Sequence, residues 1–268
     1  MDVALPVTEP ATPSRADAVA AKVEIPQYRR RMIVGVWAAA ALPMAALAWL
    51  VAPALKDRFG GEGSVPLAKA LIVCLTLGLI WQFVLVIVLA GREQRTLRWS
   101  TIREALWLRA PRSPRSGRSG GRVWLIVLPL IAAFGIEQLI PAAPHPGNRD
   151  LGSFLSSQAG HTFMHGAWGW YGVLLILFLF NTVLGEELLF RGLLLPRMNG
   201  AFGRRDWAAN GVLFAAYHLH MPWVIPATLL DTFVIAYPAK RYRSAWIGIA
   251  VHSAQSVFFA AIGLTLVL

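Results

Sequence analysis

The sequence is short of charged residues, and acidic residues are the scarcest of them. Only 15% of its 268 residues are charged, whereas soluble globular domains have about 25%. Asp and Glu number 14 against 25 Lys and Arg, which leaves a net charge of +11. The single cysteine, Cys74, excludes an intramolecular disulfide framework and disfavours a cysteine-based zinc site. The chain is 56% hydrophobic, in near-continuous runs, so an ordinary soluble domain is excluded.

The hydrophobic runs are about 20 residues long, the length that crosses the ~30 Å hydrocarbon core of a membrane. We therefore predict an all-α fold, a polytopic transmembrane helical bundle with about seven spans, and counts of roughly six to eight fit the same pattern. The predicted spans are 32–55, 66–90, 123–140, 168–195, 207–219, 222–239 and 244–268.

The polar segments divide the chain into three units. Residues 1–31 are aperiodic and are predicted to form a disordered cytoplasmic tail. Residues 32–122 hold two N-terminal spans and a basic amphipathic linker, and residues 123–268 hold the remaining spans. Within the linker, residues 97–108 have apolar side chains at helical spacing and are expected to lie on the membrane surface. Residues 109–122 are a basic Pro/Ser/Gly stretch.

Basic residues alternate from loop to loop. Five fall in the tail and nine arginines in residues 91–122, and more follow the fourth and sixth spans, whereas the intervening loops have few. By the positive-inside rule, the N-terminus is cytoplasmic and the C-terminus lies outside. We interpret the arginine-rich loop as a topology signal that contacts membrane lipids, and we expect no nucleic-acid partner.

Several ionisable residues fall inside the predicted spans, where burying a charge is costly and functional roles are common. Glu187 and Arg191 lie four residues apart on one helical face and can pair, which turns Glu186 about 100° away from them. The set comprises Glu137 near the outer end of the third span, Glu186, Glu187 and Arg191 in the fourth, His218 and His220 in the fifth, Asp231 in the sixth and His252 in the seventh.

Three of these residues, on three helices, reach a similar depth on the cytoplasmic side of the midplane. They are Glu186, His218 and His252, placed by the helical rise of about 1.5 Å per residue. A carboxylate and an imidazole in one cavity can hold and deprotonate a water molecule, a role that Glu186 and His218 fit. His252 and Ser256 lie four residues apart and can donate hydrogen bonds to the oxyanion of a hydrolysed amide.

A metal site is the alternative. Glu186, His218 and His252 are candidate zinc ligands, with water in the fourth position. The helical HExxH pattern of many zinc proteases is absent. The hypothesis without a metal requires no cofactor.

Three motifs in these spans carry a family resemblance. Residues 185–192, GEELLFRG, look like the EExxxR motif of the CPBP (Abi-like) family, which contains the CAAX prenyl endopeptidases and bacteriocin-processing proteases. Residues 214–218, FAAYH, resemble its FxxxH motif, and residues 252–256, HSAQS, resemble its last motif. Their order and their separation of about 30 residues also fit this family, and the resemblance covers roughly residues 168–260.

The resemblance implies an intramembrane endopeptidase of the glutamate type, with residues 123–268 as its protease domain. Glu186 activates water with His218, while Glu187 and Arg191 support the site. His252 and Ser256 form the oxyanion hole, although Ser256 stands where the family commonly has Asn and reaches less far.

The implied substrate is a membrane-associated protein or peptide cleaved near its C-terminus or membrane anchor. Prenylated proteins, bacteriocin precursors and C-terminally anchored proteins all fit this description. The Arg/Ala-rich composition favours a bacterial protein, which places the chain in the cytoplasmic (inner) membrane. A non-catalytic immunity or scaffold protein of the same family is the alternative, and a proton-coupled transporter ranks last because the sequence has no repeated halves.

Overall fold

Helices make up most of the part of the chain that the structure describes. The structure, a computed structural model, describes residues 23–268, and within them the only strand-like feature is an isolated bridge between Arg112 and Ser119. The predicted tail, 1–31, lies largely outside this range. Its last residues are extended, and the first helix starts at Arg30.

Four continuous helices are long and apolar enough to cross a membrane. They correspond to the first, second, fourth and seventh predicted spans. The first comprises α1 (Arg30–Ala46), η1 (Leu47–Val51), α2 (Ala52–Leu55) and η2 (Lys56–Arg58); the second is α3 (Val65–Gln94); the third comprises α8 (Trp168–Leu179), η5 (Phe180–Gly185), Glu186, Glu187, η6 (Leu188–Leu194) and α9 (Leu195–Arg197); the fourth is α14 (Ala245–Val267).

The other three predicted spans are also helical, but they are shorter or interrupted. The first of them is an unbroken helical run over residues 121–139, the second has only 12 residues, and a turn at residues 229–230 interrupts the third. They are η3 (Gly121–Ile126), α5 (Val127–Phe134) and η4 (Gly135–Leu139); then α11 (Asp206–Tyr217); then η9 (Pro222–Val224), α12 (Ile225–Thr228), η10 (Thr232–Ala236) and α13 (Tyr237–Tyr242).

Short helices connect these segments. They are α4 (Trp99–Ala105), α6 (Leu151–Leu155), α7 (Gln158–Met164), α10 (Asn199–Phe202), η7 (Gly203–Arg205) and η8 (His218–His220).

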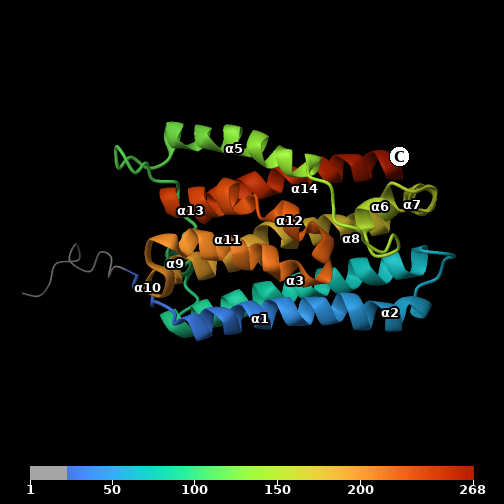
Figure 1. Ribbon diagram of the computed structural model, residues 1–268, viewed down its shortest axis with the longest axis horizontal. Coiled ribbons are helices and arrows are strands. Elements are labelled where there is room, and N and C mark those ends of the chain that lie inside the picture. The colour runs from blue at the N-terminus through green and yellow to red at the C-terminus, as the bar shows by residue number, and fades with distance from the viewer. Residues whose placement is uncertain (1–22) are drawn as a thin grey trace, which may run out of the picture.

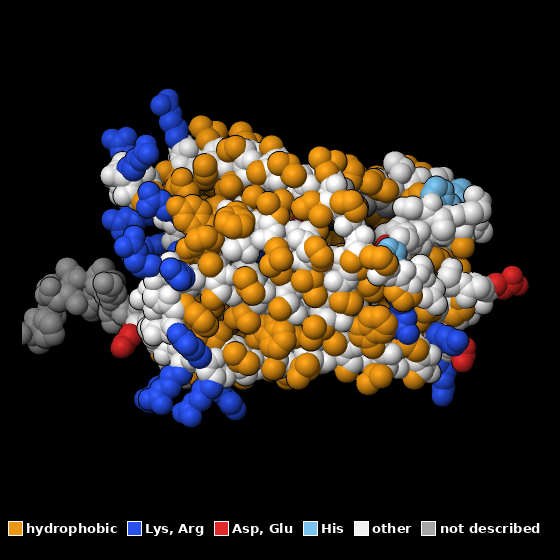
Figure 2. Space-filling model, viewed as in Figure 1, with side chains coloured by type: hydrophobic (Ala, Val, Ile, Leu, Met, Phe, Trp, Pro, Cys, Tyr) orange, Lys and Arg blue, Asp and Glu red, His pale blue; other side chains and the backbone are white. Residues whose placement is uncertain are grey.

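The long helices run side by side along one axis. In Figure 1, α1 and α3 lie along one side of the bundle, α5 and α14 along the other, and α8 and α11 between them. Figure 2 shows Lys and Arg side chains gathered at the end where α1 begins, whereas an apolar surface covers the middle of the bundle. This distribution is typical of a bundle that crosses a bilayer.

The linker 97–122 packs on the protein more closely than the expected surface position implies. Ile102 and Leu106 are buried, and because Gly192 has no side chain, the Leu106 carbonyl oxygen lies 3.3 Å from the position that a Cβ there would take. The Trp107 carbonyl accepts a hydrogen bond from Ala245 N at 2.9 Å, at the first residue of α14. The linker therefore supports the ends of two long helices, α8–α9 and α14.

A buried polar junction ties the segment before α1 to the end of α9. Arg197 is fully buried, and its Nε and Nη2 donate to Glu93 Oε2 at 2.9 and 2.7 Å. The Tyr28 hydroxyl donates to the same carboxylate, and Tyr28 N donates to the Arg197 carbonyl at 2.9 Å. Burial, together with Glu93, raises the pKa of Tyr28 above its ordinary value, so its phenol stays a donor.

Candidate active site

The candidate site begins at an irregular part of the long helix that contains the first motif. Glu186 and Glu187 stand between two π-helical segments, η5 and η6. Such wide turns occur mostly as local bulges in α-helices, often at functional sites. Neither hydropathy nor motif spacing predicts these turns.

Glu187 is the centre of the polar contacts. Its Oε1 lies 3.1 Å from Arg191 Nη1, the pair that the spacing predicted. The same oxygen lies 3.1 Å from His252 Nδ1, on α14. Because a carboxylate only accepts hydrogen bonds, His252 Nδ1 carries the proton, which leaves Nε2 to face the rest of the site. The sequence did not predict this link between the first and last motifs.

Arg191 is fully buried, yet much of its donor capacity is unused. The centre of its guanidinium group stands 4.1 Å from the centre of the Phe214 ring, a cation–π contact with the second motif. Its Nε, Nη1 and Nη2 make no hydrogen bond of good geometry with any described residue. The contrast with Arg197 is clear, because Arg197 is also buried but donates from all three nitrogens.

No ion pair joins Glu186 to a basic side chain within residues 23–268, in contrast to Glu187. Glu186 is 2% exposed, and its Oε2 has no hydrogen-bond partner among the described residues. The Tyr217 hydroxyl lies beside the Glu186 carboxyl group and accepts a hydrogen bond from Gln82 Nε2 at 2.6 Å. Sequence reasoning missed Tyr217 and Gln82. The one signal for Gln82 is that it interrupts the apolar second span.

His218 directly follows α11, as the first residue of η8, and has a defined tautomer. Its Nδ1 lies 3.0 Å from the Phe214 carbonyl oxygen, which can only accept, so the proton is on Nδ1 and Nε2 is an acceptor. Its ring stacks on His220, with 5.4 Å between ring centroids. No hydrogen bond joins His218 to Glu186 within residues 23–268.

Ser256 lies one turn beyond His252 on α14. It is buried, and its hydroxyl makes no hydrogen bond with the described residues. The neighbouring Ser253 hydroxyl instead donates to Thr182 Oγ1 at 3.3 Å, which holds α14 against η5.

Gly248 is a further residue that the sequence reasoning missed. A Cβ at this position would lie 2.2 Å from Glu187 Oε2 and 3.2 Å from Arg191 Cγ. The backbone of α14 therefore touches the buried ion pair directly. The available signal was its place one turn before His252.

Asp231 and Glu137 lie at the edge of the site that His252 forms. Both side chains are buried, and the charged neighbours of Asp231 include Glu137 and His252. Asp231 Oδ1 has no partner among the described residues. These two carboxyl groups from separate segments enlarge the polar region beyond the three motifs.

A zinc site would require several donor side chains around one point. Among residues 23–268, no group of three or more His, Cys, Asp or Glu side chains is arranged to hold a metal ion. Glu186, His218 and His252, the candidate zinc ligands, are not arranged as such a group, and the zinc hypothesis stays a prediction.

Comparison with known proteins adds an independent finding. Residues 167–258 match the family model described as type II CAAX prenyl endopeptidase Rce1-like. Residues 167–258 are an Rce1-like segment. The match runs from the start of α8 into α14 and contains all three motifs, so the resemblance that the motifs indicated is confirmed. The comparisons found no match among curated proteins and none among solved structures.

The Rce1-like segment and the apolar helices together establish the class of protein. The four apolar helices make the chain an integral membrane protein, and its residues 167–258 are similar to a family of proteases. All six candidate residues of the sequence fall inside the Rce1-like segment: Glu186, Glu187, Arg191, His218, His252 and Ser256.

Proposed function

We propose that this protein is an intramembrane endopeptidase that cleaves a membrane-associated protein or peptide near its C-terminus or membrane anchor. The observation that carries the proposal is the hydrogen bond between Glu187 and His252. It joins the first and last motifs of the Rce1-like segment in a buried polar cluster that also includes Arg191.

In the proposed mechanism, Glu186 is the general base. Its free Oε2 takes a proton from a water molecule that His218 Nε2 orients, and the hydroxide attacks the carbonyl carbon of the scissile peptide bond. The C–N bond of the resulting intermediate breaks as the proton passes from Glu186 to the leaving amine. The products are a carboxylic acid and an amine, and Glu186 returns to its carboxylate form.

The oxyanion of the intermediate requires donors. His252 donates from Nε2 as well as Nδ1 when its ring is doubly protonated, and Ser256 adds its hydroxyl. Glu187 and Arg191 hold His252 in place. The unused donors of Arg191 provide further positive potential beside the carbonyl oxygen.

The topology that goes with this function has seven crossings and a cytoplasmic N-terminus. Lys and Arg at the end of the bundle where α1 begins support that orientation. We further propose that residues 123–268 form the protease domain, that residues 32–122 support it, and that the membrane is the bacterial inner membrane.

Cleavage of a reporter peptide tests the mechanism. Purified wild-type protein is expected to cleave a C-terminally anchored or prenylated reporter, and Glu186→Ala to lose about 10²-fold or more of that activity. Arg204→Ala, an exposed residue outside the motifs, is the control and retains wild-type rates. A folded Glu186→Ala protein that cleaves at the wild-type rate would refute the glutamate mechanism. Loss of wild-type activity on chelation, with recovery on adding zinc, would replace it with a metalloprotease mechanism.

The non-catalytic alternative makes the opposite prediction. An immunity or scaffold protein would keep its cellular phenotype in a stably inserted Glu186→Gln variant. The family match to proteases does not favour this alternative.

A further inference from the structure

The linker that precedes α5 forms an ordered, strongly basic hairpin rather than an extended chain. Ser113 N donates to the Arg118 carbonyl at 2.8 Å, and Gly120 N donates to the Pro111 carbonyl at 3.0 Å. Arg112 N donates to the Tyr242 carbonyl at 2.9 Å, which fixes the hairpin to the end of α13. The hairpin lies outside the Rce1-like segment, whereas Tyr242, to which it is bonded, lies within that segment.

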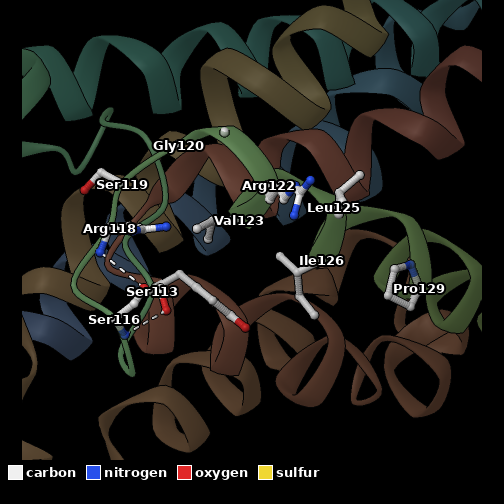
Figure 3. A pocket seen from close by; sticks show the side chains of 12 residues that line it. Ser113, Ser116, Arg118, Ser119, Gly120, Arg122, Val123, Leu125, Ile126 and Pro129 are labelled. Carbon is white, nitrogen blue, oxygen red and sulfur yellow. Dashed lines mark hydrogen bonds between the residues drawn. The ribbon is translucent and has the colours of Figure 1, made fainter.

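Two adjoining cavities open between this hairpin, α5 and α13. The larger has a volume of about 690 Å³ and is lined in part by Arg118, Arg122 and Val123 (Figure 3). The smaller has a volume of about 490 Å³ and is lined in part by Arg115 and Arg241. Ser113, Ile126 and Tyr242 line both cavities, so the two lie side by side and are called here the hollow.

The charge of this hollow is of one sign. No Asp or Glu is among the residues that line either cavity. The side chains of its four arginines make no ion pair or hydrogen bond with any residue in the described range 23–268. Arg109, at the base of the same linker, contrasts with them because it pairs with Glu104. The hollow thus presents unpaired guanidinium groups, which favour phosphate through paired N–H donors.

Its floor and outer wall are apolar. Ile126, Leu130 and Phe233 line the cavities, and Phe233 is 62% exposed on the outer face of the bundle. Leu125, at the rim, is 60% exposed. Because the third predicted span starts at Val123, the arginines stand at headgroup depth and the apolar wall at acyl-chain depth.

We propose that this hollow binds the headgroup of an anionic phospholipid from the cytoplasmic leaflet. The arginines hold the phosphate, and an acyl chain follows the apolar wall between α5 and α13. This chemistry is narrower than general contact with lipids, because it assigns one defined site to an anionic headgroup. It does not depend on the proposed proteolysis.

Hydrogen bonds connect the proposed lipid site to the helix that carries His252. The hairpin is bonded to the α13–α14 turn through Tyr242, and Ser244 Oγ donates to the Arg109 carbonyl at 2.6 Å. Ser244 directly precedes α14, which carries His252. A bound lipid therefore holds together the linker and the start of the helix that completes the site.

Lipid binding to the full-length protein in a neutral detergent provides the test. Native mass spectrometry measures binding of phosphatidylglycerol and of phosphatidylcholine to wild type, to Arg118→Gln/Arg122→Gln and to Arg204→Gln/Arg205→Gln. The last variant is a matched control, since it removes the same charge from exposed arginines that line neither cavity. Thermal melting without lipid establishes that each variant is folded.

We expect phosphatidylglycerol to bind the wild type more tightly than phosphatidylcholine. Each arginine near an anionic headgroup contributes about fivefold in affinity, so the pocket variant loses roughly 30-fold. The control variant keeps its affinity to within about twofold. Equal binding of both lipids, an unchanged pocket variant, or an equal loss in the control would overturn the proposal. Glycerol phosphate that binds as tightly as the lipid would show that the chains contribute nothing, and the lipid assignment would be wrong.

Discussion

The substitution Gly248→Ala adds one methyl group next to Glu187, at the centre of the candidate site. A Cβ there would lie 2.2 Å from Glu187 Oε2, and ordinary contact begins at 3.4 Å, so the two must separate by about 1.2 Å. Glu187 cannot yield freely, because Arg191 and His252 hold its other oxygen, each at 3.1 Å. The shift therefore displaces the ion pair or moves α14.

The expected effect of Gly248→Ala falls on activity more than on stability. A misplacement of about 1 Å can reduce a rate by about 10²-fold. Overpacking of this kind costs about 1–3 kcal/mol of the free energy of unfolding. Initial rates of reporter cleavage give the first quantity, and thermal unfolding in detergent gives the second.

Gly172→Ala is the matched control for this change. Gly172 lies in α8, and a Cβ there meets nothing within 4 Å. Its rate is expected to equal that of the wild type. A Gly248→Ala protein with wild-type activity would refute the assignment of Glu187 and His252 to the site.

Two further substitutions test contacts around the site. Tyr217→Phe removes the hydroxyl group that accepts a hydrogen bond from Gln82, and the buried Gln82 donor that is left without a partner costs about 1–3 kcal/mol of the free energy of unfolding. The rate of cleavage is expected to fall about tenfold, because Glu186 loses the neighbouring hydroxyl group. Tyr171→Phe is its control, since that hydroxyl bonds to the Ala260 carbonyl away from the motifs, and equal losses in both would contradict the role of Tyr217. Arg197→Ala removes the ion-pair partner of the Glu93 carboxylate and is expected to lower the free energy of unfolding by about 3–5 kcal/mol. An unchanged melting temperature would contradict a stabilising role of this ion pair.

Hydropathy and motif spacing predicted a large part of this molecule. The four long helices follow from the uninterrupted apolar runs, because length and composition alone decide whether a helix can cross a bilayer. The pairing of Glu187 with Arg191 follows from their separation of four residues on a helix, and the structure has it.

The remaining features depend on contacts between distant parts of the chain. The bond from His252 to Glu187 joins residues 65 positions apart, and only the packing of α14 on η5 creates it. Gly248 carries no chemical signal of its own, since its role is to be small. The π-helical turns on either side of Glu186 and Glu187 also have no signal in hydropathy or motif spacing.

The helical spacing in residues 97–108 predicts a helix but not the surface on which the helix packs. The apolar residues of this segment do have helical spacing, and α4 forms over Trp99–Ala105. A protein surface and a membrane surface both accept an apolar face, so spacing alone does not distinguish them. In the structure, Ile102 and Leu106 pack against the protein and are buried.

The bond between Glu187 and His252 has a consequence for biosynthesis. Chains emerge N-terminus first, so Glu187 and Arg191 enter the membrane before α14 has been made. During that interval Arg191 is the partner that lowers the cost of placing a carboxylate in hydrocarbon. His252 arrives last, and with it the connection between the motifs. A nascent chain therefore lacks the connection between the first and last motifs until α14 is inserted.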